Sequence, residues 1–180
     1  MTRPRLHRLA LIIGLLCLPL GLGAQETTVV LIRHAERASL LDGDSPLSDA
    51  GQQRARALVS QLEPFHPAVL YASDQQRTQQ TLAPLAVRLG KVPLLRPKDG
   101  SIALAAEILK DHRGQTVLLC WHHDLLKKVV RALGVKGPVP YWSLTTYDRI
   151  WIVRVPPNGD AALEERPQSA PADTAQAQGR

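Results

Sequence analysis

Histidine and arginine side chains come directly after three of the apolar runs in this chain. They are Arg33 and His34 after the first run, Arg77 after the second, and His122 and His123 after the last of the three. A neutral imidazole is a competent nucleophile toward phosphorus, and an arginine fork matches two phosphate oxygens at once. Phosphoryl transfer is catalysed mainly by positioned cations, because charge spreads over the equatorial oxygens. These residue types therefore favour a phosphoryl-transfer site.

The apolar runs belong to a regular alternation of expected strands and helices. We expect strands at 27–32, 69–72, 92–95, 115–121 and 148–155. Helical patterns follow the first, second, third and fourth strands. This alternation predicts an α/β fold, an α/β/α sandwich with a mostly parallel central sheet. Ligands of such sheets bind outside the carboxyl ends of the strands, so the histidines and arginines are expected at one edge.

Capping residues mark where the expected helices begin. Ser48 and Asp74 are interpreted as helix N-caps, and Ser101 as the cap of a third helix. The expected inward face of that third helix is Ile102, Ala105, Ala106 and Leu109.

The two ends of the chain differ from its middle in composition. Residues 1–24 combine arginines, a short apolar run and small residues, which is typical of a secretory signal peptide. An uncleaved N-terminal anchor is the alternative, although the run is short for a membrane span. Residues 156–180 are rich in Pro, Ala, Gln and Asp, so a disordered tail is expected there. The folded domain is then 27–155, and its expected location is periplasmic or secreted.

Charge and cysteine content exclude some classes of partner and of stabilisation. Cleavage would remove Arg3, Arg5 and Arg8, lowering the net charge from +6 to +3, which does not indicate a nucleic-acid partner. Contact with a membrane is expected only through the signal segment before cleavage. The remaining Cys120 has no second cysteine to pair with, so the core alone must stabilise the domain.

Four segments together resemble the histidine phosphatase superfamily, which includes phosphoglycerate mutases. They are LIRHAE at 31–36, LSDAG at 47–51, YASDQQRTQQT at 71–81 and VLLCWHH at 117–123. Each segment ends an expected strand or opens the next helix, and the four occur in the order typical of the family. The resemblance covers essentially the whole of 27–155. The resemblance implies a phosphoglycerate mutase-like three-layer sandwich.

The resemblance also implies a role for each matching residue. His34 corresponds to the histidine that is phosphorylated, and Arg33 and Arg77 to its phosphate-binding arginines. His122 corresponds to a second pocket histidine that contacts the phosphoryl group. The implied function is that of a phosphatase, a phosphoric monoester hydrolase acting through a phosphohistidine intermediate. Neither a metal nor an organic cofactor is expected.

Two positions depart from the family pattern. The fourth strand ends in His122 and His123; side-chain alternation along a strand favours His122 for the pocket and leaves His123 as the alternative. No residue stands out as the acid that protonates the leaving oxygen. Glu36, close to His34, is preferred over Glu107, and neither is assigned.

Two other functions remain as alternatives. A metal-dependent hydrolase could use His34, His122, His123 and Asp124, but the usual two-histidine helical spacing is missing. A non-catalytic phosphate- or phosphoprotein-binding domain could retain the pocket without the acid. The expected partner is a small phosphorylated substrate or a phosphoprotein. Substrate identity and oligomeric state cannot be inferred from the sequence.

Overall fold

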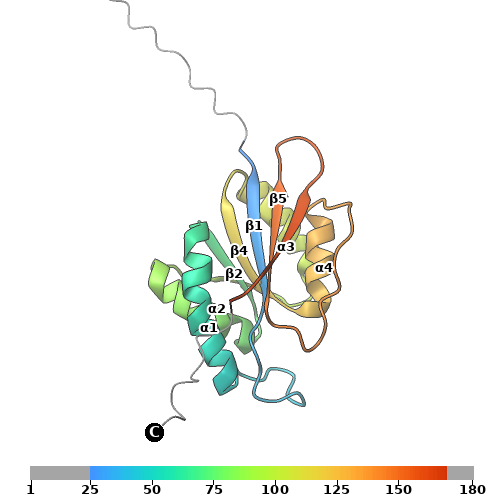
Figure 1. Ribbon diagram of the computed structural model, residues 1–180. Coiled ribbons are helices and arrows are strands. Elements are labelled where there is room, and N and C mark those ends of the chain that lie inside the picture. Colours follow the sequence, from blue (N-terminus) through green and yellow to red (C-terminus); the bar gives the residue numbers. More distant parts are fainter. Residues whose placement is uncertain (1–24, 170–180) are drawn as a thin grey trace, which may run out of the picture.

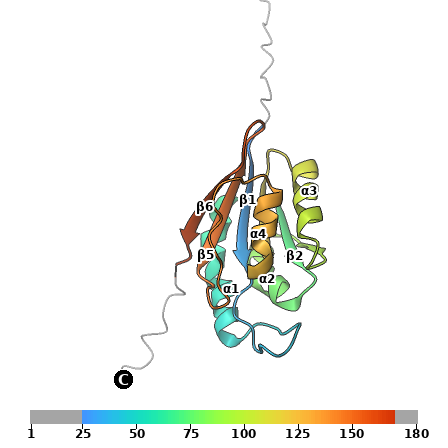
Figure 2. The ribbon, with the colours of Figure 1, turned by 90° about the vertical axis from the view of Figure 1, so that its right-hand side faces the viewer.

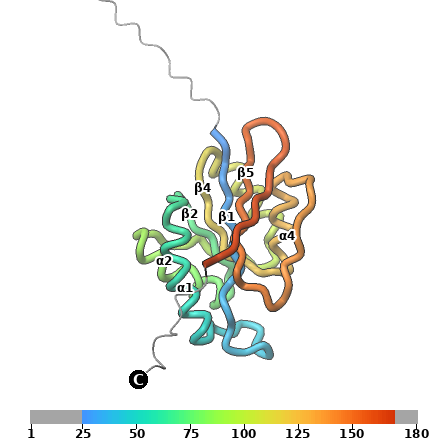
Figure 3. The backbone as a smooth tube through the Cα atoms, viewed as in Figure 1, coloured from blue at the N-terminus to red at the C-terminus, as the bar shows by residue number. Residues whose placement is uncertain are grey.

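A six-stranded sheet forms the centre of the computed structural model, which describes residues 25–169 (Figure 1). The strands are β1 (Thr27–Arg33), β2 (Val69–Ser73), β3 (Leu94–Arg96), β4 (Thr116–Trp121), β5 (Arg149–Val155) and β6 (Ala162–Pro167). Their order in the sheet is β3-β2-β4-β1-β5-β6. Strands β1 to β4 are mutually parallel, β5 is antiparallel to β1, and β6 is antiparallel to β5. The tube in Figure 3 shows β1 running through the middle of the domain.

Helices cover both faces of this sheet. They are α1 (Asp49–Leu62), α2 (Gln76–Leu89), α3 (Ser101–Asp111) and α4 (His123–Ala132), with a 3-10 turn at Glu63–Phe65. The α1–α2 pair packs on one face and the α3–α4 pair on the other, as the two views of the ribbon show (Figures 1 and 2). The predicted three-layer α/β/α sandwich with a mostly parallel sheet is confirmed.

The apolar run of β1 is explained by its central position. Val29 and Leu31 pack into the core on the α3–α4 face, while Val30 and Ile32 pack into the core on the α1–α2 face. Because neither face of this strand is exposed to solvent, its side chains from Val29 to Ile32 are all apolar and do not alternate with polar ones. The register pairs Arg33 with Trp121, so β1 and β4 end at the same level.

The C-terminal boundary expected from composition is wrong. Residues 156–169 are part of the domain, because β6 pairs antiparallel with β5 along its whole length. Composition suggested disorder because β6 is polar. An edge strand needs little apolar surface when the neighbouring backbone and ion pairs such as Arg149–Glu165 hold it. The predicted signal peptide and residues 170–180 lie outside the described residues.

Two local expectations also differ from the structure. In α3 the buried side chains are Ser101, Leu104, Ala105 and Ile108, and Ile102 is 69% exposed. The apolar residues of this helix fit more than one face, so their pattern did not determine the register. Asp74 does not cap α2, which begins after Gln75; instead its Oδ1 accepts a hydrogen bond from the Lys98 amide at 3.1 Å.

Within residues 25–169 no helix has the length and apolar character needed to cross a membrane.

Candidate active site

His34 lies directly after β1, with its imidazole 4% exposed. Nδ1 of the ring is 2.8 Å from the carbonyl oxygen of Ala35, which can only accept, so Nδ1 carries the proton. The lone pair is therefore on Nε2. Burial, followed by the positive charges of Arg33, Arg77 and Arg37, lowers the pKa of His34 to about 3. The ring is thus neutral near pH 7, as a nucleophile must be.

Arg33 is the last residue of β1 and is 2% exposed. Its Nη1 donates to the carbonyl oxygens of Ser143 (3.0 Å) and Thr146 (2.8 Å), in the loop before β5. Its guanidinium lies over the ring of Tyr147, 3.9 Å from the centroid. Nε is buried without a partner among the described residues and remains free to donate to a bound oxyanion.

Arg77 comes from the first turn of α2 and is also buried. Its Nη1 donates to the Gly43 carbonyl oxygen (2.9 Å) and to Oε1 of Gln75 (3.1 Å). Its Nη2 lies 3.3 Å from Nδ1 of His122, and its buried Nε has no partner within residues 25–169. Two arginines on different elements are therefore fixed by backbone carbonyls, each with a donor unused.

A chain of hydrogen bonds orients the His122 ring. Because a guanidinium only donates, Nδ1 of His122 accepts from Arg77, and the ring proton is on Nε2. Nε2 donates to Oγ of Ser73 (2.9 Å), which in turn donates to Oγ1 of Thr78 (2.9 Å). Burial, followed by the charges of His34 and Arg77, lowers the pKa of His122 to about 2. Both rings are neutral in this arrangement, with their centroids 5.4 Å apart.

These side chains line one cavity of about 200 Å³ at the carboxyl ends of β1, β2 and β4. Its lining residues are Arg33, His34, Arg37, Arg77, Lys98, His122, His123, Asp124 and Leu144. His122 is almost fully buried, whereas His123 begins α4 at the rim, with 24% of its side chain exposed. The structure thus brings five predicted site residues together: Arg33, His34, Arg77, His122 and His123.

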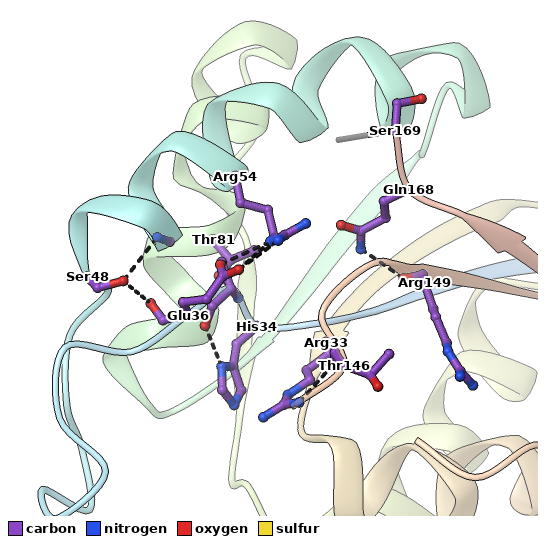
Figure 4. A network of polar contacts seen from close by, with 12 residues as sticks. Arg33, His34, Glu36, Ser48, Arg54, Thr81, Thr146, Arg149, Gln168 and Ser169 are labelled. Atoms are coloured by element: carbon purple, nitrogen blue, oxygen red, sulfur yellow. Dashed lines mark hydrogen bonds and ion pairs between the residues drawn. The ribbon is translucent and has the colours of Figure 1, made fainter. Parts of the chain in front are cut away.

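The two glutamates expected as proton donors do not line the cavity. Figure 4 shows Glu36 turned toward Arg54 of α1, while the ring of His34 extends the other way. Arg54 binds the Glu36 carboxylate through Nε (2.9 and 3.0 Å) and Nη2 (2.7 Å). Burial raises the pKa of Glu36, but the hydrogen bonds from Arg54 outweigh it, and the net shift is downward.

The carboxylate of Glu107, in α3, is bound by two other side chains. It accepts a hydrogen bond from Nε of Arg96 (2.8 Å) and from the Tyr71 hydroxyl (2.7 Å). The hydrogen bonds from Arg96 lower the pKa of Glu107 to about 2, so its carboxylate is ionised near pH 7. Glu107 fixes β3 to α3 and does not reach the cavity.

The LSDAG turn supports the loop that carries His34. Ser48 caps α1 by accepting from the Gly51 amide, and its own amide donates to the Glu36 carbonyl oxygen at 2.9 Å. A Cβ on Gly51 would lie 2.1 Å from that same carbonyl oxygen, so only glycine fits. From the other side, Oγ1 of Thr81 accepts from the Ala35 amide at 2.9 Å.

Sequence reasoning missed four residues of the cavity lining and one residue that supports it. They are Arg37, Lys98, Asp124, Leu144 and the stacked Tyr147. Asp124 was considered only as a metal ligand. Lys98 and Tyr147 have no local motif, because separate loops bring them to this edge. No group of three or more His, Cys, Asp or Glu side chains within residues 25–169 is arranged to hold a metal ion.

Comparisons of sequence and of fold both point to one family of proteins. The sequence model of the histidine phosphatase superfamily (branch 1) matches residues 29–99, from β1 to the turn after β3. The fold is that of histidine phosphatases. The resemblance of this chain to the phosphoglycerate mutase-like histidine phosphatase superfamily is therefore confirmed.

Particular proteins similar to this chain carry phosphatase names. An 8-oxo-(d)GTP phosphatase of Mycolicibacterium smegmatis is 43% identical over 70 residues, which are 36% of this chain and 22% of that protein. The chain thus matches under a quarter of the length of this relative.

Solved structures share the fold at low identity. A mycobacterial glucosyl-3-phosphoglycerate phosphatase in complex with VO3 has a TM-score of 0.62 and 17% identity, covering 79% of this chain and 99% of its own. The protein histidine phosphatase SixA with tungstate has a TM-score of 0.60 and 20% identity, covering 78% and 96%. YhfR of Bacillus stearothermophilus has a TM-score of 0.63 and 19% identity, covering 79% and 98%.

Proposed function

We propose that this protein is a phosphatase in which Nε2 of His34 accepts a phosphoryl group from a phosphorylated small molecule or phosphoprotein. The observation that carries the proposal is the Nδ1 hydrogen bond of His34, which leaves a neutral Nε2 in a buried cavity lined by guanidinium groups. Phosphatase names among the relatives agree with this activity. The predicted signal peptide adds a periplasmic or secreted location to the proposal.

The reaction proceeds in two steps. Nε2 attacks phosphorus, the bond to the leaving oxygen breaks, and the phosphoryl oxygens are bound by Arg33 and Arg77 through the ε N–H groups that lack partners. Water then attacks the phosphohistidine, inorganic phosphate leaves, and the electron pair returns to Nε2. His122 lies beside the phosphoryl group and supports its binding by accepting a hydrogen bond from Nη2 of Arg77, which holds that guanidinium in place.

A rapid-quench experiment tests the nucleophile. Wild type, His34→Ala and His66→Asn, a change at an exposed histidine outside the cavity, are mixed with p-nitrophenyl phosphate in EDTA. We expect acid-labile, base-stable phosphoprotein and turnover in wild type and His66→Asn, and neither in His34→Ala. Removing a nucleophile costs several orders of magnitude in rate.

The other outcomes identify the alternatives. Phosphate binding without turnover or phosphoprotein in wild type would indicate a binding domain. Activity that is lost only in EDTA would indicate a metal-dependent hydrolase. Equal turnover in wild type and His34→Ala would end the assignment.

A further inference from the structure

The cavity holds more positive charge than one phosphoryl group requires. Arg37, in the loop after β1, and Lys98, in the turn after β3, line it together with Arg33 and Arg77. Both added side chains are half-buried, and neither forms an ion pair or side-chain hydrogen bond with any residue in 25–169. The backbone holds both residues in place. Arg37 forms an isolated antiparallel β-bridge with Leu47, and the Lys98 amide donates a hydrogen bond to Oδ1 of Asp74.

The electric field of these two cations reaches the reacting groups. Burial is the largest cause of the low pKa values of His34 and His122. The charge of Arg37 lowers the pKa of His34 further, and the charge of Lys98 lowers that of His122. Four cationic side chains and one carboxylate line the cavity, so its net charge is +3 with neutral histidines. A phosphomonoester dianion leaves part of this charge uncompensated, whereas a diphosphate group matches it.

The cavity also lacks a built proton donor. Its only carboxylate among the described residues is Asp124, whose side chain is 53% exposed. More than half of this side chain faces solvent, so no carboxyl group of the described residues is enclosed in the cavity. A sugar or alkyl alkoxide leaves poorly without a proton. A phosphate group that leaves from an anhydride is a stable anion and needs none.

We propose, on the basis of the phosphatase function above, that the substrate class is a phosphoanhydride. The terminal phosphoryl group occupies the cradle of Arg33, Arg77 and His122, and the adjacent phosphate is bound by Arg37 and Lys98. A cavity of about 200 Å³ accommodates a diphosphate unit, and the rest of the substrate lies outside. Arg37 and Lys98 thereby select for an anionic leaving group.

The step balances without a further reactant. Nε2 of His34 forms the N–P bond, and the P–O bond to the bridging oxygen breaks with its electron pair remaining on that oxygen. The leaving phosphate carries the added negative charge, which Arg37 and Lys98 neutralise. Water then cleaves the N–P bond, giving inorganic phosphate and a proton and restoring neutral His34.

Competing substrates test this proposal in wild type, Arg37→Gln, Lys98→Gln and the double variant. The probes are inorganic tripolyphosphate, p-nitrophenyl phosphate and 3-phosphoglycerate, in EDTA. We expect wild type to prefer tripolyphosphate. The measured quantity is the ratio of kcat/KM for tripolyphosphate to kcat/KM for p-nitrophenyl phosphate. This ratio should fall about tenfold in each single variant, because one charge-assisted contact to the leaving phosphate is lost. It should fall about 100-fold in the double variant, which loses both contacts. Arg56→Gln and Lys128→Gln remove the same charges from exposed positions outside the cavity and should leave that ratio unchanged.

The outcomes separate this proposal from the proposed function. If p-nitrophenyl phosphate is hydrolysed in a His34-dependent way but the ratio does not change in the variants, the leaving-phosphate site is overturned and the phosphatase stands. If wild type prefers 3-phosphoglycerate over tripolyphosphate, the phosphoanhydride substrate class is overturned, and Arg37 and Lys98 form a site for some other anionic group of the substrate. Turnover of all probes without His34 overturns both.

Discussion

At the scale of single residues, the site depends on imidazoles held neutral in a cationic cavity. Burial is the main reason that the pKa values of His34 and His122 lie at about 3 and about 2. In the unfolded chain these groups titrate near pH 6.5. The unfolded state therefore binds more protons than the folded state between these values. The stability contributed by the neutral rings is complete above about pH 6.5 and is lost as the pH falls toward about 3.

This difference predicts how stability depends on pH. Between pH 7 and 5 the free energy of unfolding should decrease as the pH falls, since the glutamates begin to titrate only below that range. In His34→Gln the slope should be shallower by about 1 kcal/mol per pH unit on average over this range, approaching about 1.4 near pH 5, because the ring of His34 no longer takes up a proton on unfolding. Urea titrations at several pH values measure the slope. Parallel curves for the two proteins would contradict the low pKa of His34.

At the scale of elements, the His34 loop is held between α1 and α2. The Glu36 carbonyl oxygen receives the Ser48 amide, and Gly51 passes so close to it that a methyl group would overlap. Helix α1, which covers one face of the sheet, thus also positions the loop that carries His34.

Gly51→Ala should disturb both stability and activity. The added methyl group would force the Glu36 backbone away, and overpacking of this kind costs about 1–3 kcal/mol. Urea denaturation measures the loss, and kcat for p-nitrophenyl phosphate should fall as the loop shifts. Gly137→Ala, where a Cβ meets nothing within 4 Å, is the matched control. Equal stability of the two variants would refute this packing argument.

The sequence predicted the parts of this structure that depend on local pattern. Side-chain type and spacing predicted the apolar run of β1, the Ser48 cap, the place of His34 at the end of β1 and that of Arg77 shortly after β2. Lys98 and Tyr147 could not be predicted this way, since their place in or beside the cavity depends on how distant loops close over one edge. Glu36 was misjudged because nearness to His34 in sequence does not show that Arg54 binds its carboxylate.

At the scale of the whole molecule, β6 completes the sheet and supports a buried tryptophan. Nε1 of Trp151, whose side chain is fully buried, donates to Oε2 of Glu165 at 2.7 Å. Leu163 packs against the core on the α3–α4 face. The segment continues to Gln168, whose Nε2 donates to the Arg149 carbonyl oxygen (Figure 4), and to Ser169, whose amide donates to Oε1 of Gln61.

Truncation tests the contribution of β6. A chain that ends after Ala161 should lose about 2 kcal/mol or more of unfolding free energy, because the indole N–H of Trp151 loses its partner and Leu163 its packing. A chain that ends after Ser169 is the control and should unfold like wild type. Thermal and urea unfolding of the two shortened chains measure the difference. Full stability of the shorter chain would show that β6 is dispensable.

The anchoring of Arg33 has a consequence for the order of assembly. Its guanidinium is held by carbonyl groups of Ser143 and Thr146, more than a hundred residues downstream. A ribosome that has synthesised only the first hundred residues has therefore made Arg33 and His34 but not the carbonyl groups that hold the Arg33 guanidinium. The cavity is therefore not complete until the last third of the polypeptide has emerged and β5 has joined the sheet.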